Sequence, residues 1–163
     1  MDEARRLERF HEWSEQHGAI VERAARAFAR GADRDDLRQE LLLAIWRAIP
    51  SFRGEARPST FLYRVVHNAA LLWRRGRRAA AESLESIAEP AAPERGGDEG
   101  RLSALFAAIR RLPPVDRSLV LLSLDGVAYA EMAEIHGLTP NAVGARLTRA
   151  RDRLATDLER SSE

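Results

Sequence analysis

Cysteine is absent from this chain of 163 residues. Without thiols the chain can form no disulfide and no thiolate-bound metal site. A reducing compartment is therefore the simplest expected location. No apolar run approaches the roughly 20 residues of a membrane-spanning helix. The N-terminal stretch MDEARRLERF is charged and lacks the apolar centre of a signal peptide. The sequence therefore predicts a soluble protein of the cytoplasm.

Lysine is absent as well, so all 26 basic residues are arginines. A GC-rich coding bias explains this most simply, although arginine is also the better bidentate ligand for phosphates and bases. The 25 acidic residues leave a net charge of only +1. Because no global field indicates a nucleic-acid partner, the local distribution of charge carries the information.

Signatures of metal and phosphate sites are missing too. The four histidines, His11, His17, His67 and His136, have no ligand spacing, and no phosphate-cradling glycine loop occurs. We therefore expect no catalytic residue, no metal and no cofactor. The composition, 45% hydrophobic and 31% charged, is that of a globular chain with room for one medium domain or two small ones.

Helical periodicity dominates the sequence and predicts an all-α fold. The first forty residues contain two apolar stripes, one ending at Gly18 and the other near Gly31. Asp33 is a plausible N-cap for the next helix, which would turn Leu37 and Leu41 inward. The opposite side of that helix carries Asp36, Gln39, Glu40, Leu43 and Arg47. By itself this pattern favours a solvated face with one stray leucine, and a protein-binding face is the alternative.

The segment from residue 57 to residue 80 holds six arginines and no acid, the strongest charge segregation in the chain. It follows a proline-containing loop, and Ser59 is the expected cap of a helix from about Thr60 to Arg78. Arginines at the C-terminal end of a helix complement its dipole, which is one explanation. Phosphate binding is the other, because side chains that could stack on or hydrogen-bond to bases lie close by. These side chains are Tyr63, His67, Asn68 and Trp73.

Residues 79–100 differ in composition, with two prolines, three glycines and six acids. Such a segment cannot bury a core and is typical of a flexible linker. We therefore divide the chain into a helical domain of residues 1–80, an acidic linker of residues 81–100 and a second helical domain of residues 101–163. Negative charge in the linker would repel DNA, and could lie against the basic helix before DNA arrives.

The second domain contains a sequence typical of two helices that meet at a tight turn. Tyr129 to His136 has a helical pattern, and Gly137 can adopt the positive φ that ends a helix. Thr139 and Pro140 are suited to begin the next helix, in which Val143 would fill the gap between the two. This spacing predicts a helix-turn-helix motif. An ordinary pair of core helices is the alternative.

The second of these helices has two different faces. Arg146, Arg149 and Arg153 flank an apolar stripe, whereas Asn141, Ala145 and Thr148 point away from it. Small residues let a helix backbone approach the bases of the major groove, and arginines reach phosphates or guanine edges. The pattern therefore favours binding to duplex DNA.

Two blocks of the sequence resemble the bacterial RNA polymerase sigma factors of the extracytoplasmic-function (ECF, group IV) type. The first, DLRQELLLAIWRAIPSFRGEARPSTFLYRVVHNAALLWRRGRR, is similar to region 2 of that family. The second, LPPVDRSLVLLSLDGVAYAEMAEIHGLTPNAVGARLTRARDRL, is similar to region 4. Their order, their separation by a linker and the chain length match the family's two-domain plan.

The resemblance implies a role for each face. It implies docking on the β′ clamp helices of core RNA polymerase through Asp36, Gln39, Glu40, Leu43 and Arg47, in place of the solvated-face interpretation. It implies binding to the −10 element through Phe52, Arg53, Gly54, Phe61, Tyr63, Arg64, His67, Asn68, Trp73, Arg74 and Arg75. It implies reading of the −35 element through Thr139, Asn141, Ala145, Arg146, Thr148, Arg149 and Arg153. The expected partners are core RNA polymerase, including its β subunit, promoter DNA and an anti-sigma factor.

The sequence departs from the family pattern at a few positions. The family usually has an aromatic residue at Pro58, tryptophan at Phe61, aspartate at Leu72 and a basic residue at Gly144. Two other functions stay open. A stand-alone helix-turn-helix regulator would bind DNA as a dimer, but no heptad stretch supplies a dimer interface. A sigma-like decoy would bind a regulator without opening DNA, which fits the missing aromatics around Pro58.

Overall fold

The computed structural model describes residues 1–83 and 97–161, and every regular element in these ranges is a helix. The predicted all-α class is therefore confirmed. The elements are α1 (Glu3–Phe28), α2 (Gly31–Ala48), the 3₁₀ turn η1 (Ile49–Ser51), α3 (Pro58–Ser83), α4 (Asp98–Arg111), α5 (Pro114–Leu124), α6 (Tyr129–His136) and α7 (Pro140–Ser161). Most of the expected acidic linker, residues 84–96, lies outside the described residues. The predicted bounds of 81–100 are too wide, because residues 81–83 belong to α3 and residues 98–100 belong to α4.

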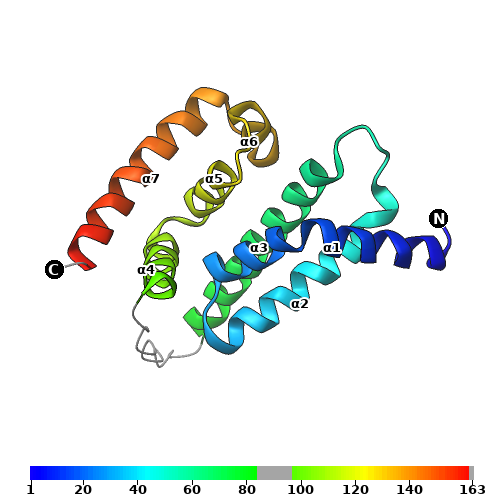
Figure 1. Ribbon diagram of the computed structural model, residues 1–163, viewed down its shortest axis with the longest axis horizontal. Coiled ribbons are helices and arrows are strands. Elements are labelled where there is room, and N and C mark those ends of the chain that lie inside the picture. The colour runs from blue at the N-terminus through cyan, green and yellow to red at the C-terminus, as the bar shows by residue number, and fades with distance from the viewer. Residues whose placement is uncertain (84–96, 162–163) are drawn as a thin grey trace.

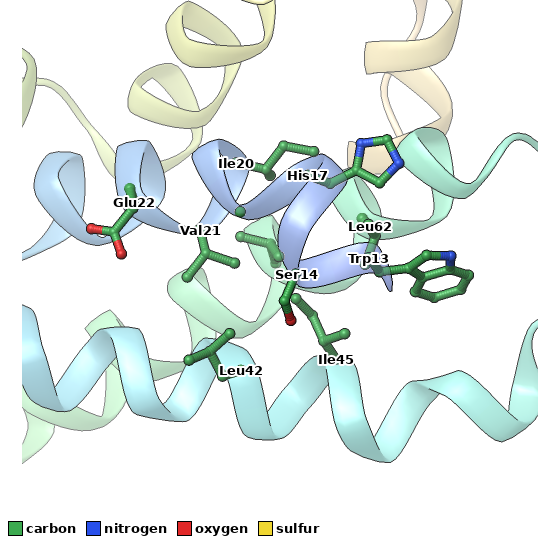
Figure 2. A pocket seen from close by; sticks show the side chains of 11 residues that line it. Trp13, Ser14, His17, Ile20, Val21, Glu22, Leu42, Ile45 and Leu62 are labelled. Carbon is green, nitrogen blue, oxygen red and sulfur yellow. The ribbon is translucent and has the colours of Figure 1, made fainter. Parts of the chain in front are cut away.

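Helices α1, α2 and α3 pack against one another as the first domain (Figure 1). Each buries one apolar stripe, and Leu37, Leu41, Leu62 and Val66 are almost fully enclosed. A cavity of about 180 Å³ remains between the three helices. Trp13, Leu42 and Ile45 are among its lining residues, so it lies behind the exposed face of α2 (Figure 2).

Several predicted boundaries in this domain are wrong. Gly18 does not end a helix, because α1 continues through it to Phe28. The buried side chains on both sides of Gly18 outweigh a glycine penalty of about 1 kcal/mol. Asp33 does not cap α2, which begins at Gly31 with φ 56°. The carboxylate of Asp33 instead pairs with Arg77 in the C-terminal half of α3.

Both ends of α3 also differ from the prediction, because the helix continues past the expected end at Arg78 to Ser83. The helix begins at Pro58 and not after a Ser59 cap. Proline suits the first helical position because its missing N–H would have no partner there. The carbonyl of Arg57 accepts the first intrahelical hydrogen bond, from the amide of Phe61 at 3.1 Å.

Helices α4, α5 and α6 pack against α7, which lies on the outer side of the second domain (Figure 1). Leu112 and Pro113 separate α4 from α5, and Pro114 begins α5 at a position where its missing N–H would have no partner. Asp116 lies in the first turn of α5, where the helix dipole favours a carboxylate.

The two domains touch each other, which the sequence did not predict. Helices α1 and α3 of the first domain contact α4, α5 and α6 of the second. The buried residues of both domains belong to one continuous cluster. Much of the contact is nevertheless polar: the Nε of Arg23 lies 2.8 Å from the Oδ1 of Asp125, and the Nη1 of Arg110 donates to the carbonyl of Arg26 at 2.9 Å.

Candidate polymerase and DNA interfaces

The outer side of α2 carries the residues expected to dock on polymerase. Asp36, Gln39, Glu40, Leu43 and Arg47 are all exposed, and 43% of Leu43 is accessible. The inner residues at the same helical spacing are buried, which fixes the rotation of α2 in the domain. The helix therefore presents a continuous polar surface with one exposed leucine.

The loop after α2 is held to the domain by aromatic rings. Phe52 packs edge-on against Trp13 and also contacts Phe61, in both cases at 5.1 Å between ring centroids. Arg53 and Gly54 are exposed at the tip, where Gly54 has φ 77°. The rings of Phe52 and Phe61 thus anchor the loop in this conformation, and Arg53, one of the loop residues predicted to contact the −10 element, is exposed on it.

Helix α3 separates its predicted −10 residues onto different sides. Arg64, Asn68 and Arg75 are exposed and follow one stripe, with Leu72 between them at 62% exposure. Trp73 is half-buried, and the guanidinium of Arg77 lies 5.2 Å from the centroid of its ring. Arg74 is half-buried as well.

His67 and Tyr63 do not lie on the exposed side of α3, and we correct their placement. His67 is 1% exposed, and its Nδ1 is hydrogen-bonded to the Oγ of Ser118 on α5. Burial, followed by the charges of His136 and Arg23, lowers the pKa of His67 to about 3. Neither residue can reach DNA freely while the domains are in contact, because both face the second domain.

Tyr63 is half-buried beside Asp125, at the C-terminal end of α5. Burial, followed by the charge of Asp125 and a hydrogen bond to it, raises the pKa of the Tyr63 hydroxyl to about 12. The phenol therefore stays protonated and donates to a carboxylate that also pairs with Arg23. Tyr63 thus belongs to the contact between the domains.

Helices α6 and α7 form the predicted helix-turn-helix. Gly137 ends α6 in the left-handed conformation, with φ 65° and ψ 35°. The Oγ1 of Thr139 accepts from the amide of Ala142 at 3.2 Å, so Thr139 caps α7 as expected. Val143 and Leu147 are fully buried, which fixes the rotation of α7.

The outer side of α7 carries most of the predicted −35 residues. Thr139, Asn141, Ala145, Thr148, Arg149 and Arg153 are exposed. Arg146 differs, because its Nη1 lies 2.8 Å from the Oδ1 of Asp116 on α5. We therefore correct its placement. Arg146 links α7 to α5 through its ion pair with Asp116, whereas the side chains of Arg149 and Arg153 are exposed to solvent.

Gly144 lies inside α7 next to the ring of Tyr129. A Cβ built on Gly144 would meet the Cε2 of Tyr129 at 3.4 Å, an ordinary van der Waals contact. We expect Gly144→Ala to raise the free energy of unfolding by about 1 kcal/mol, because alanine has the higher helix propensity. Urea unfolding followed by circular dichroism would measure this. Gly137→Ala is the matched control and should destabilise, since its positive φ strains any side chain.

Sequence reasoning missed two buried polar residues of α5, Arg117 and Ser118. The Nε of Arg117 donates to the carbonyl of Leu112 at 2.7 Å, and its guanidinium lies 5.5 Å from the ring centroid of Phe28 in the other domain. Burial, followed by the charges of Arg74 and Arg110, lowers the pKa of Arg117 to about 10. Both residues precede an apolar run, and nothing in that pattern indicates a partner in another domain.

No helix within residues 1–83 or 97–161 combines the length and the apolar character needed to cross a bilayer. Among the same residues, no three side chains of the metal-binding kind come together. Neither absence identifies a function.

Two protein-family models match separate parts of the chain. A family model described as Sigma-70 region 2 matches residues 14–80, and one described as Sigma-70, region 4 matches residues 102–154. The ECF RNA polymerase sigma factor SigM of Mycobacterium tuberculosis is 33% identical over 149 residues, which cover 90% of this chain and 75% of SigM. The ECF RNA polymerase sigma-E factor of Escherichia coli K12 is 31% identical over 141 residues, covering 77% and 73%.

Two solved structures have the same fold. The sigma factor RpoE of Bartonella quintana, in complex with the anti-sigma factor NepR, has a TM-score of 0.72 at 22% identity, covering 91% of this chain and 95% of RpoE. CnrH, in complex with the cytosolic domain of CnrY, has a TM-score of 0.64 at 27% identity, covering 92% and 87%. The helix-turn-helix, the exposed face of α2 and these similarities lead to one conclusion: the chain belongs to the ECF family of RNA polymerase sigma factors and acts in promoter-specific initiation of transcription.

Proposed function

We propose that α2, α3 and α7 divide the work of initiation between them. The exposed face of α2 docks on the polymerase clamp, α3 and the loop before it contact the −10 element, and α7 reads the −35 element as duplex. Residues 1–80 thus serve polymerase and the −10 region, and residues 101–163 serve the −35 region. The observation that carries the proposal is the rotation of α2, which buries its apolar side and leaves all five expected docking residues accessible.

The exposed cations support the two DNA contacts. Arg64 and Arg75 project from α3, and Arg149 and Arg153 project from α7. Arginine at such positions neutralises phosphates and can bond guanine edges in the major groove. We propose no catalytic residue in this chain, since core polymerase makes the RNA. Polymerase and chromosome share the bacterial cytoplasm, which we propose as its location.

An anti-sigma factor is a further proposed partner. The solved relative RpoE was captured with one, which supports the idea that a protein regulator of the same kind holds this chain. Isolating the protein from cells and identifying its companions by mass spectrometry would test this.

Arg149→Ala is the direct test of the −35 contact. We expect it to lower the affinity of the holoenzyme for its promoter by about 1–3 kcal/mol, because it removes a cation that can bond a base edge. Arg160→Ala is the matched control, since Arg160 is exposed in the last turn of the same helix. Run-off transcription with core polymerase and a heparin challenge would measure the effect. Equal losses in the two variants would contradict the assignment, and no transcript from the unchanged protein would indicate a decoy.

A further inference from the structure

The contact between the domains contains two histidines that share one hydroxyl. His67 on α3 is buried and bonds through Nδ1 to the Oγ of Ser118 on α5. The same oxygen lies 2.7 Å from the Nε2 of His136 on α6. Ser118 is itself completely buried. A single hydroxyl thus joins an imidazole of the first domain to an imidazole of the second.

The chemistry of this bridge requires neutral rings. A hydroxyl has one hydrogen to donate, and each neutral imidazole has one donor and one acceptor nitrogen. One ring therefore donates to the oxygen of Ser118, and the other accepts its hydrogen. Protonation of the accepting ring would leave the hydroxyl hydrogen without its acceptor and place a charge where water cannot solvate it.

The surroundings of the two rings also oppose protonation. Arg23 from α1 acts on His67, and Arg146 from α7 acts on His136, each as a nearby positive charge. Tyr63, the neighbour of His67 on α3, has its ring centroid 6.1 Å away and is neutral. The pKa of His67 is lowered to about 3, and that of His136 is lowered by burial and then by Arg146.

The nearby carboxylates do not offset this, because each already has an arginine partner. Asp125 pairs with Arg23 at 2.8 Å, Asp116 pairs with Arg146 at 2.8 Å, and Glu131 lies 3.9 Å from Arg57. A protonated histidine here would have to compete with a guanidinium for its counter-charge.

We propose that His67, Ser118 and His136 form a proton-sensitive latch, which holds the two domains together while both rings are neutral and releases them when a ring is protonated. Release exposes the side of α3 that carries Tyr63 and His67, next to the stripe of Arg64 and Asn68. The latch thus couples domain separation to the uncovering of further surface on the proposed −10 helix. The proposal concerns the free chain and stands independently of any promoter contact.

The direction of the pH dependence follows from the lowered pKa values. In the separated state the rings recover an ordinary pKa of about 6.5. The neutral rings therefore contribute their full stabilisation to the closed state when the pH is above about 6.5. This stabilisation decreases as the pH falls from about 6.5 toward the pKa of the rings in the closed state. Between about pH 7.5 and pH 5.5 the ratio of closed to open protein should fall by about ten-fold through His67 alone. His136 adds to this in the same direction.

Energy transfer between two dyes on the full chain would measure the release. The chain has no cysteine, so Glu15→Cys on α1 and Glu159→Cys on α7 give two specific labelling sites, both exposed. We expect transfer to decrease as the pH falls from about 7.5 to about 5.5, with helix content by circular dichroism unchanged. An unchanged transfer efficiency over this range would overturn the proposal.

Glutamine variants identify the groups that respond. His67→Gln with His136→Gln keeps hydrogen-bonding side chains that cannot titrate, so the pH response should vanish. Asp125 and Glu131 remain in this variant, and any response that persists in it contradicts the latch. His11→Gln is the matched control, since His11 is exposed on α1 and should leave the response intact. Where the double variant does not fold, His136→Gln alone must reduce the response, because that ring is only half-buried.

Discussion

Core RNA polymerase is expected to raise the affinity of this chain for promoter DNA by about 10²- to 10⁴-fold. Each proposed DNA-contacting face has few exposed arginines, chiefly Arg64 and Arg75 on α3 and Arg149 and Arg153 on α7. Each domain alone should therefore bind weakly and lose affinity as salt is added. In this structure the proposed DNA-contacting sides of α3 and α7 belong to domains that touch each other, because α3 contacts α5 and α6. Polymerase would hold the domains apart and turn the second contact into an intramolecular one.

Fluorescence anisotropy on a labelled promoter fragment, at about 150 mM salt, with and without core polymerase, would measure the difference. A promoter with a scrambled −35 element serves as the control. Tight and specific footprinting by the isolated chain under the same conditions would contradict the expectation. It would instead favour the stand-alone regulator, which binds unaided as a dimer.

Leu43→Glu is expected to weaken binding to core polymerase by about 30-fold or more, with no loss of folding. An exposed leucine surrounded by polar residues has the character of an interface anchor, and such anchors contribute about 2 kcal/mol or more. Folding should be unaffected, because 43% of Leu43 is exposed and surface substitutions usually change stability by less than about 0.5 kcal/mol. Affinity for core polymerase can be measured by microscale thermophoresis.

Leu7→Glu is the matched control for Leu43→Glu. Leu7 is 48% exposed on α1, so Leu7→Glu introduces the same charge in the same domain but on a different helix. If the two variants bind polymerase equally well, the docking role of α2 is wrong. If both variants lose binding to polymerase, the loss reflects a general effect of negative charge on the first domain and not a specific contact of Leu43.

Features that depend on neighbours in the chain could be predicted from the sequence. The helix-turn-helix is an example, because Gly137, Thr139 and Pro140 act within one or two turns of where they stand. The exposed face of α2 is another, since a 3.6-residue period determines which side is apolar. Boundaries were less predictable: Gly18 remained inside α1 and Asp33 bonded to Arg77, because tertiary packing outweighed the local preference.

The sequence by itself determined the helical class, the two blocks of the sigma family and the sides of α2 and α7 that face outward. Only the tertiary structure decided that His67 and Tyr63 turn away from the exposed stripe of α3, that Arg146 is held by Asp116, and that the domains meet. The physical reason is distance along the chain. His67 and Ser118 are 51 residues apart, and no periodicity or capping rule relates side chains that meet only when two domains pack.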